Sequence, residues 1–201
     1  MFSIITFLYC SFNFANLGYL WVIDREWPLG LRAWTMYTAT MIEKMDSIAL
    51  RKHKGISFVG VTVSFVCYDK TGQVFMAKRS KNARDEHGKW DGGGGGLKHG
   101  DTLENTVRRE ILEEYGADVL QLDYLGHFEA FRTNEAGQKT HWIAHCYAAL
   151  VDHGRVRIME PEIFDDSGWF DLDALPEPLH SQWVEKFLPL YGKKLRKIIT
   201  P

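Results

Sequence analysis

Five consecutive glycines, residues 92–96, stand directly before a predicted helix that carries three carboxylates. These carboxylates are Glu110, Glu113 and Glu114, at the spacings i, i+3 and i+4. Because an α-helix turns once in about 3.6 residues, Glu110 and Glu114 lie only about 40° apart around its axis, with Glu113 on the adjoining flank. Three like charges this close repel one another and destabilise an isolated helix. The pattern therefore indicates that a cation lies close to this helix.

Two kinds of cation satisfy this pattern, a metal ion or basic side chains. Mg²⁺ and Mn²⁺ prefer carboxylate oxygens and keep positions open for substrate phosphates, which would indicate an enzyme acting on a phosphate ester or anhydride. Arg109 can pair at i, i+4 with Glu113, so a salt-bridge network accounts for one of the three charges. The core-facing stripe of the helix consists of Leu103, Val107 and Ile111. Glu114 projects into this stripe, where an unpaired carboxylate costs several kcal/mol. The helix alone leaves both alternatives open.

The wider spacing resembles the signature of the Nudix family, Gly-x5-Glu-x7-Arg-Glu-U-x-Glu-Glu-x-Gly-U, in which U is a bulky aliphatic residue. The matching positions are Gly95, Arg109, Glu110, Ile111, Glu113, Glu114 and Gly116. Asp101 stands where the family has Glu, and Ala117 is small for the last position. Neither difference touches the three helix carboxylates. The resemblance extends from about Ile56 to the C-terminus, and a match at this many fixed spacings is specific.

The resemblance implies a hydrolase in which water attacks a phosphorus of a nucleoside diphosphate-linked compound. The implied cofactor is Mg²⁺, with Mn²⁺ as a substitute. The implied principal metal ligands are Glu113 and Glu114, joined by the carbonyl of Gly94, with Glu110 as a third ligand or as the base. Which carboxylate removes the proton varies within the family. Arg109 is implied to orient Glu113. Family members often have proline where this chain has Gly93, so we expect a less pre-organised loop, at an entropic cost of up to about 1 kcal/mol.

Four further residues are candidates for binding a nucleotide substrate. Lys78 and Arg79 end the second predicted strand and could hold the terminal phosphates, although a solvated hairpin end is the alternative. Leu179 and His180 precede the last predicted helix, where MutT-like relatives hold the base. This similarity favours a nucleoside triphosphate as substrate, converted to a nucleoside monophosphate and pyrophosphate. The alternatives are hydrolysis of ADP-ribose, a nucleotide sugar or a dinucleoside polyphosphate, or a non-catalytic nucleotide-binding regulatory module.

Several other polar residues are candidate metal ligands. A late acidic metal ligand occurs in some relatives, and its candidates here are Glu129, Glu160 and Glu162. Histidines recur on the predicted strands at His127, His141 and His145. Because His141 and His145 are four residues apart on a strand, they share a face. We interpret these histidines as ordinary polar strand residues.

The order of strand and helix signals after Lys54 predicts an α/β fold, an α/β/α sandwich with a mixed β-sheet. The expected strands are residues 57–68, 73–78, 119–131, 141–151 and 167–170. One expected helix follows an N-cap at Asp101 or Thr102 and ends at Gly116. The other covers residues 181–199, with Trp183, Phe187, Leu190 and Leu195 as core contacts. Residues 56–201 are therefore predicted to be the hydrolase domain, and residues 1–55 an N-terminal extension.

Charge and cysteine usage restrict the partners and the compartment. The net charge of −2 provides no basic field that would recruit nucleic acid or an anionic membrane. Cys10, Cys67 and Cys146 are far apart and odd in number, which favours buried thiols in a reducing compartment over disulfides or a zinc site. We therefore expect a cytoplasmic enzyme whose partner is a small-molecule nucleotide. The resemblance also allows a homodimer, since many family members are dimers.

The uncharged, aromatic-rich run at residues 2–23 is long enough to span a bilayer, but it contains several polar residues and has no preceding lysine or arginine. It indicates no firm membrane partner. Three interpretations are a weak membrane anchor, an N-terminal packing arm, or sequence upstream of a later start at Met36, Met41 or Met45. The last is favoured slightly. Mass spectrometry of the natural product should then detect no peptide from before Met36, and one such peptide would eliminate this interpretation.

Overall fold

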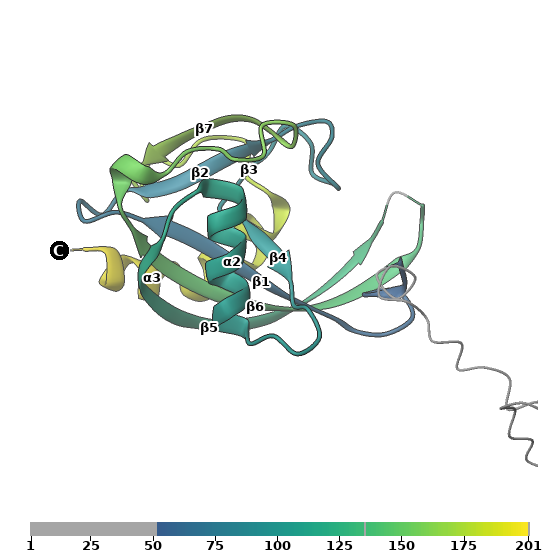
Figure 1. Ribbon diagram of the computed structural model, residues 1–201. Coiled ribbons are helices and arrows are strands. Elements are labelled where there is room, and N and C mark those ends of the chain that lie inside the picture. Colours follow the sequence, from purple (N-terminus) through teal and green to yellow (C-terminus); the bar gives the residue numbers. More distant parts are fainter. Residues whose placement is uncertain (1–51, 135, 201) are drawn as a thin grey trace, which may run out of the picture. The chain divides into compact units, whose positions relative to one another are not determined.

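A mixed β-sheet forms the centre of the domain in the computed structural model, which describes residues 52–134 and 136–200 (Figure 1). The strand order is β3-β2-β1-β6-β5, with β4 also paired to β1 and β7 to β2. β1 is parallel to β6 and antiparallel to β2 and β4. The strands are β1 (Gly60–Tyr68), β2 (Val74–Arg79), β3 (Trp90–Asp91), β4 (Gly94–Gly96), β5 (Val119–Thr133), β6 (Lys139–Val151) and β7 (Phe164–Phe170).

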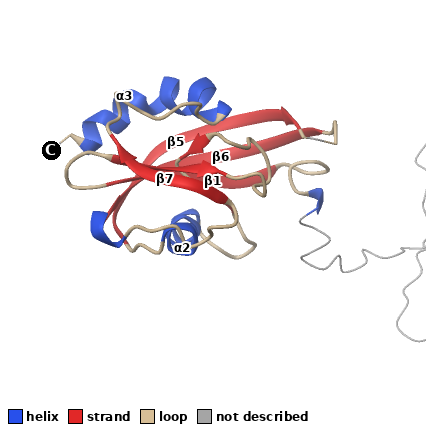
Figure 2. Cartoon of the chain, turned by 90° about the horizontal axis from the view of Figure 1, so that it is seen from above, coloured by secondary structure: helices blue, strands red, loops and turns tan. Residues whose placement is uncertain are grey.

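Helices cover both faces of this sheet (Figure 2). α2 (Leu103–Tyr115) lies on one face, and the π-helical turn η2 (Trp183–Phe187) with α3 (Leu188–Ile199) lies on the other. A 3₁₀ turn, η1 (His153–Arg155), follows β6. The predicted α/β/α sandwich with a mixed sheet is therefore confirmed. In the described part of the chain, no helix combines the length and apolar character that crossing a bilayer requires.

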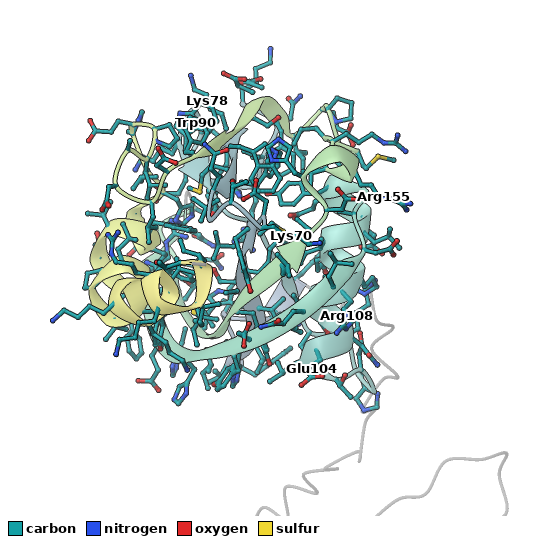
Figure 3. The ribbon with its side chains drawn as sticks, turned by 90° about the vertical axis from the view of Figure 1, so that its left-hand side faces the viewer. Lys70, Lys78, Trp90, Glu104, Arg108 and Arg155 are labelled. Atoms are coloured by element: carbon teal, nitrogen blue, oxygen red, sulfur yellow. The ribbon has the colours of Figure 1, made fainter. Side chains whose placement is uncertain are left out.

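The ends of α2 are set by local sequence. The side chain of Thr102 accepts a hydrogen bond from the backbone N–H of Asn105, and Gly116 ends the helix in the left-handed conformation with φ 61°. Both cap residues agree with the prediction. Glu104 and Arg108 project outwards from the helix (Figure 3), whereas Val107 and Ile111 are fully buried. The helix thus presents its predicted apolar stripe to the sheet.

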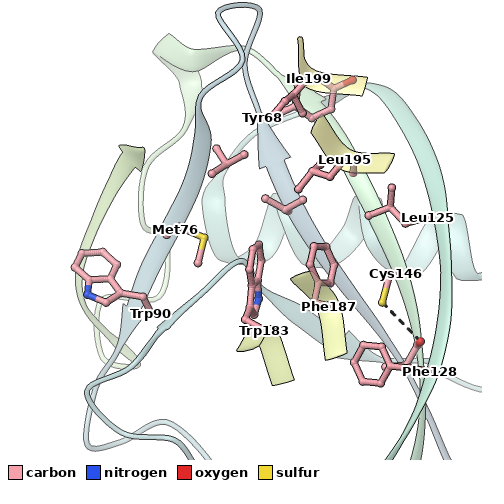
Figure 4. Packing of buried hydrophobic residues seen from close by; sticks show 14 of the residues in the cluster. Tyr68, Met76, Trp90, Leu125, Phe128, Cys146, Trp183, Phe187, Leu195 and Ile199 are labelled. Carbon is pink, nitrogen blue, oxygen red and sulfur yellow. Dashed lines mark hydrogen bonds between the residues drawn. The ribbon is translucent and has the colours of Figure 1, made fainter. Parts of the chain in front are cut away.

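Each face of the sheet has its own core, because side chains alternate along the strands. On the α2 side, Phe65 packs with Val107, Ile111 and Tyr115. On the other side, Met76 packs with Trp183, Phe187 and Leu195 (Figure 4). Cys67 and Cys146 are buried free thiols, as predicted. They lie on opposite faces of the sheet, and burial raises the pKa of the Cys146 thiol to about 12. Cys10 lies outside the described residues, as do the interpretations offered for residues 1–35.

The last helix differs from its prediction in one respect. Trp183, Phe187 and Leu195 are buried as expected, but Leu190 is 55% exposed. The N–H of Leu188 bonds the carbonyl of Trp183, five residues back, directly before Pro189. Proline has no N–H and clashes with the carbonyl four residues earlier, so the helix widens by one residue at this point. The extra residue rotates Leu190 away from the core.

The strand boundaries also differ. β1 begins at Gly60 rather than at Ser57. A Cβ on Gly60 would lie 2.4 Å from the Trp142 ring. β5 and β6 extend further towards their connecting turn than expected, to Thr133 and from Lys139. Sequence signals missed the short strands β3 and β4, since two residues and three glycines carry no strand periodicity.

The turn between β1 and β2 is built on a buried carboxylate. One oxygen of Asp69 accepts hydrogen bonds from the N–H of Thr71 and Gln73 and from the Thr71 hydroxyl, at 2.9, 3.0 and 2.7 Å. The other oxygen lies 2.6 Å from Nδ1 of His153, whose ring stacks on Trp169. Burial alone would raise the pKa of Asp69, but the hydrogen bonds outweigh it and lower the pKa from its usual 3.8.

Asp69→Asn should therefore lower the free energy of unfolding by about 1–3 kcal/mol at neutral pH, because it removes acceptors from a buried turn. A carboxylate with a lowered pKa stabilises the fold above its unfolded pKa, and this contribution is lost as the pH falls through the folded pKa. Urea unfolding should show the difference from wild type shrinking below about pH 3.8. Asp171→Asn, which changes an exposed carboxylate nearby, should alter stability by less than about 0.5 kcal/mol. Equal losses in both variants would contradict the assignment.

Candidate active site

The glycine run lies alongside β1 and is held there through its backbone. Gly93 accepts a hydrogen bond from the N–H of Phe65 at 3.1 Å, and Gly95 accepts one from the Thr62 hydroxyl at 2.7 Å. The Tyr115 hydroxyl donates to the carbonyl of Gly92 at 3.0 Å. A segment without side chains is therefore fixed to both the sheet and α2. These hydrogen bonds hold a loop that the sequence predicts to be less pre-organised than one with proline at residue 93.

Two of these glycines leave room for the carboxylates of α2. A Cβ on Gly95 would lie 2.0 Å from Cδ of Glu110, so no other residue fits unless Glu110 moves. A Cβ on Gly93 would lie 2.4 Å from the Phe65 ring and 2.9 Å from Oε2 of Glu114. Gly93 also has φ 119°, which proline, fixed near −65°, does not adopt. The chain thus requires glycine here for the helix to approach the strand.

The three carboxylates of α2 differ in burial. Glu114 is 8% exposed, the Glu110 side chain is 14% exposed, and the Glu113 side chain is 48% exposed. Burial raises the pKa of Glu114 well above its usual 4.5, and the negative charges of Glu110, Asp91 and Glu160 add to the effect. Burial also raises the pKa of Glu110, although Arg109 opposes the shift. The helix therefore carries two carboxylates whose ionised forms are disfavoured.

Arg109 neutralises part of this charge. Its Nη1 atom lies 2.8 Å from Glu110 and 2.9 Å from Glu113, so the expected i, i+4 pair is present and includes a second carboxylate. Nε and Nη2 of Arg109 are buried without hydrogen-bond partners. Nε is 3.9 Å from Asp101, too far for a hydrogen bond. Aspartate is one methylene shorter than the glutamate of the Nudix signature, and here it does not reach the guanidinium.

Arg109 does not neutralise Glu114, whose Oε2 atom is buried without a hydrogen-bond partner. Among residues 52–134 and 136–200, no three His, Cys, Asp or Glu side chains converge closely enough to hold a metal ion as they stand. The contacts of Glu110 and Glu113 with Arg109 provide the physical reason. The donor set nevertheless suits a hard divalent cation, because an orphaned carboxylate oxygen faces Gly93 of the glycine run, whose backbone carbonyls are further oxygen donors. A fourth carboxylate, Glu160, lies within electrostatic range of Glu110, Glu113 and Glu114.

The other two late acidic candidates, Glu129 and Glu162, do not share the electrostatic interaction of Glu160 with all three carboxylates of α2. Glu129 is on β5, with its carboxylate 3.7 Å from Nε2 of His141. Burial raises the pKa of Glu160, and the charge of Glu162 adds to this shift. The backbone carbonyl of Glu162 accepts hydrogen bonds from Ser80 and Asn82. Of the three, Glu160 is the one that the fold brings to the helix carboxylates.

The two basic candidates on β2 face opposite sides of the sheet. Arg79 follows Phe75 and Ala77 on the α2 side, and its charge reaches Glu114. It is also bound to Asp85 at 3.1 Å and to Asp91 at 3.4 Å. Lys78 follows Val74 and Met76 on the other side of the sheet, and its partner on the neighbouring strand β3 is Trp90 (Figure 3). The structure therefore brings Arg79, and not Lys78, to the carboxylates.

Leu179 and His180 connect the last helix to the strand before the glycines. The N–H of Trp90 donates to the carbonyl of Pro178, and the N–H of His180 donates to the carbonyl of Trp90, both at 2.8 Å. His180 is 7% exposed, and its Nδ1 accepts from the N–H of Gln182. Burial lowers the pKa of His180, so its ring is neutral at pH 7. Leu179 is half-buried against the core on the α3 side.

Asp91 is a site residue that sequence reasoning missed. Its Oδ1 atom accepts hydrogen bonds from the N–H of Gly92 at 2.8 Å and from Nε1 of Trp183 at 3.0 Å. Its Oδ2 atom lies 3.4 Å from Arg79. This carboxylate thus joins β2, the glycine run and η2. Its position directly before five glycines is the signal that could have identified it.

Comparison with known proteins identifies the family. The family model described as NUDIX domain matches residues 59–191. The chain belongs to the Nudix family. It is a Nudix hydrolase, and members of this family act on nucleotide-linked substrates. The region matched contains both the glycine run and all three carboxylates of α2.

Curated Nudix relatives include enzymes with different substrates. The chain is 31% identical over 145 residues to the oxidized purine nucleoside triphosphate hydrolase of Danio rerio, covering 69% of this chain and 84% of that protein. It is 40% identical over 82 residues to the NAD-capped RNA hydrolase NudC of Chromobacterium violaceum, covering 41% of this chain but only 28% of that protein. The second similarity is thus confined to a part of a longer enzyme.

Solved structures share the fold. The MutT Nudix hydrolase of Burkholderia pseudomallei aligns with a TM-score of 0.55 at 31% identity, covering 63% of this chain and 95% of that one. The Nudix domain of Shewanella oneidensis NrtR, solved with ADP ribose, aligns with a TM-score of 0.55 at 21% identity, covering 75% of this chain and 98% of that one. At that identity, the second comparison supports the fold alone.

The burial of Glu114 gives a test that needs no substrate. A carboxyl with a raised folded-state pKa destabilises the fold at every pH above its usual 4.5, and the cost grows until the folded pKa is reached. Glu114→Gln removes this charge while keeping the shape, so in EDTA at neutral pH the thermal midpoint should rise by about 2 °C or more. Glu113→Gln loses an exposed ion pair and should not raise the midpoint. A fall with Glu114→Gln would contradict an uncompensated buried charge.

Proposed function

We propose that the chain is a Mg²⁺-dependent nucleoside triphosphate pyrophosphohydrolase, which releases a nucleoside monophosphate and pyrophosphate. The observation that carries this proposal is the buried, unpartnered Oε2 of Glu114 beside a side-chain-free strand in a Nudix hydrolase. The similarity to an oxidized purine nucleoside triphosphate hydrolase over 69% of the chain supports triphosphates, including damaged ones, as substrates.

The metal would be held by Glu110, Glu113 and Glu114, with Glu160 in reach as an additional carboxylate. Carbonyls alternate in direction along a strand, so that of Gly94 faces away from β1 while those of Gly93 and Gly95 face towards it. The Gly94 carbonyl is thereby left as the backbone ligand. Bound Mg²⁺ would neutralise charge on the phosphate oxygens and acidify the attacking water. Mn²⁺, which shares the preference for oxygen ligands, could replace it.

The chain's own residues would position substrate and base. Arg109 orients Glu110 and Glu113 through one nitrogen, and Glu110 would serve as the third metal ligand or as the general base. Arg79, held by Asp85 and Asp91, would attract the negative phosphate chain towards the carboxylates. The sequence predicts that Lys78 holds terminal phosphates, but because Lys78 lies on the opposite face beside Trp90, we propose it for the nucleoside side of the substrate instead.

The nucleobase of the substrate would lie where the segment before η2 meets β3, at the backbone contacts of Leu179 and His180 with Trp90. The neutral ring of His180 offers one N–H and no charge, which suits recognition of an uncharged base. Buried free thiols support a reducing, cytoplasmic location for this small-molecule enzyme. Neither a nucleic-acid nor a membrane partner is proposed, and a homodimer stays a prediction from the family resemblance.

A nucleotide panel with Mg²⁺ tests the proposal. It should contain oxidised and unmodified purine nucleoside triphosphates, ADP-ribose, NAD and a dinucleoside polyphosphate, with pyrophosphate and phosphate release followed separately. Pyrophosphate release from triphosphates is expected, and joint replacement Glu113→Gln with Glu114→Gln should reduce it by at least about a hundredfold. Glu104→Gln, an exposed carboxylate in the first turn of the same helix, is the matched control and should retain activity.

Three results would contradict the proposal. Preferential hydrolysis of ADP-ribose or NAD would replace the substrate class while keeping the site, in keeping with the similarity to NudC. Activity that survives the double replacement would eliminate the metal assignment. Calorimetry that detected no Mg²⁺ or Mn²⁺ uptake by folded protein, even with a nucleotide present, would remove the catalytic role and leave a nucleotide-binding module.

A further inference from the structure

Two histidines face each other outside the candidate active site, on adjacent strands at the edge of the sheet. His127 on β5 and His145 on β6 are directly opposite in the antiparallel register, and β5 is the last strand of the sheet order. Their ring centres are 5.7 Å apart, with the ring planes inclined by 36°. His127 is exposed and His145 is half-buried. The pair is therefore open to solvent.

A β-bulge creates this juxtaposition. Tyr124 and His127 are three residues apart and would face opposite sides of a regular strand. The register shifts between Tyr124 and Gly126, and the extra residue Leu125 packs into the core on the α3 side. As a result, Tyr124 pairs with Tyr147 and His127 with His145, all on the α2 side of the sheet. Sequence spacing alone could not place these rings on one face.

The separation of the rings matches a shared metal ion. With a zinc–imidazole bond of about 2.0–2.1 Å and a ligating nitrogen about 1.1 Å from the ring centre, two histidines on one tetrahedral ion have ring centres about 5.2 Å apart. The observed 5.7 Å differs from this value by about half an ångström, which small side-chain rotations accommodate. His127, which is exposed on the edge strand, can make such a rotation readily.

The surroundings of His145 prepare it as a ligand. Its Nδ1 lies 3.1 Å from the Tyr124 hydroxyl, whose oxygen can accept a hydrogen bond from Nδ1–H and so favour the tautomer with Nε2 unprotonated. Burial lowers the pKa of His145, and the neighbouring His127 lowers it further, so the ring is neutral at pH 7. A neutral imidazole with its second nitrogen fixed by an outer hydrogen bond is the usual state of a metal-bound histidine.

The third histidine on this face, His141, does not converge with the pair, and its buried Nε2 has no hydrogen-bond partner. His141 stacks on Phe131 with ring centres 4.4 Å apart, and its Nε2 lies 3.7 Å from the Glu129 carboxylate. No group of three ligating side chains exists in the described ranges, so water would complete the coordination of an ion bound here. This restricts the site to two protein ligands.

We infer that His127 and His145 form a binding site for a borderline transition-metal ion of the Ni²⁺, Cu²⁺ and Zn²⁺ group. Imidazole nitrogen suits these ions, whereas Mg²⁺ prefers oxygen ligands, so the site discriminates against the ion proposed for α2. The inference does not depend on the proposed hydrolase activity. It also replaces our interpretation of these two histidines as ordinary polar strand residues.

Calorimetric titration of untagged, full-length protein with Zn²⁺, in excess Mg²⁺, tests this site. One tightly bound Zn²⁺ is expected, and His127→Asn and His145→Asn should each weaken it by at least about tenfold, since losing a ligand costs no less than losing an outer-shell partner. His141→Asn is the matched control on the same strand and face, and it should bind Zn²⁺ as wild type does. Wild-type affinity in His127→Asn or His145→Asn, or an equal loss in His141→Asn, would overturn the inference.

A second measurement on the wild-type chain does not require any variant to fold. Substoichiometric Cu²⁺ should broaden the ring signals of two of the eight histidines in proton–carbon NMR spectra, those of His127 and His145. Electron paramagnetic resonance of the same sample should show coupling to two nitrogens. Broadening spread evenly over the histidines, or a spectrum without nitrogen coupling, would contradict a defined two-histidine site.

Discussion

Glu114 lies with an unpartnered carboxylate oxygen against a strand that has no side chains, and the rest of the site depends on this contact. The contact requires glycine at residue 93, where a Cβ would meet both Phe65 and Glu114. It also requires α2 to be held close, which the hydrogen bond from Tyr115 to Gly92 achieves. The helix caps fix the phase of α2, so that Glu114 and not an apolar residue faces the glycines. Packing of the core on the α2 side thus holds Glu114 in a buried position that is unfavourable for its carboxylate.

The charged groups of α2 do not fully satisfy one another. Arg109 satisfies one oxygen each of Glu110 and Glu113 but leaves its own Nε and Nη2 without acceptors, partly because Asp101 is too short to reach them. Natural proteins rarely leave buried polar groups unpaired without a functional reason. Unpaired donors and an unpaired acceptor on one helix indicate a site whose electrostatic balance is completed by a bound ion or substrate, as the proposed function requires.

Local sequence signals predicted those parts of the structure that depend on neighbouring residues. Thr102 and Gly116 set the ends of α2, and the four-residue repeat of Val107 and Ile111 set its buried face. Non-local effects were not predictable. Pro189 changed the helical phase so that Leu190 became exposed, and the bulge at Leu125 moved His127 to the face of His145. One inserted residue reverses the face of every later side chain, and the alternating pattern of a strand does not reveal where the insertion falls.

The convergence of Arg79, Asp91 and Trp183 shows why the substrate side of the site is the least readable from sequence. These residues come from β2, β3 and η2, and only the sheet order and the joint at Trp90 bring them together. Asp91 bonds the glycine run and the last helix with the same oxygen, so a displacement of the helix would be transmitted to the strand that faces Glu114. A ligand that contacts the helix near Leu179 and His180 would therefore act on the same rigid unit that positions the carboxylates. In the proposed function, the half-buried carboxylate of Asp91 would couple recognition of the nucleobase to alignment of the phosphate chain, a link that the helix motif alone does not reveal.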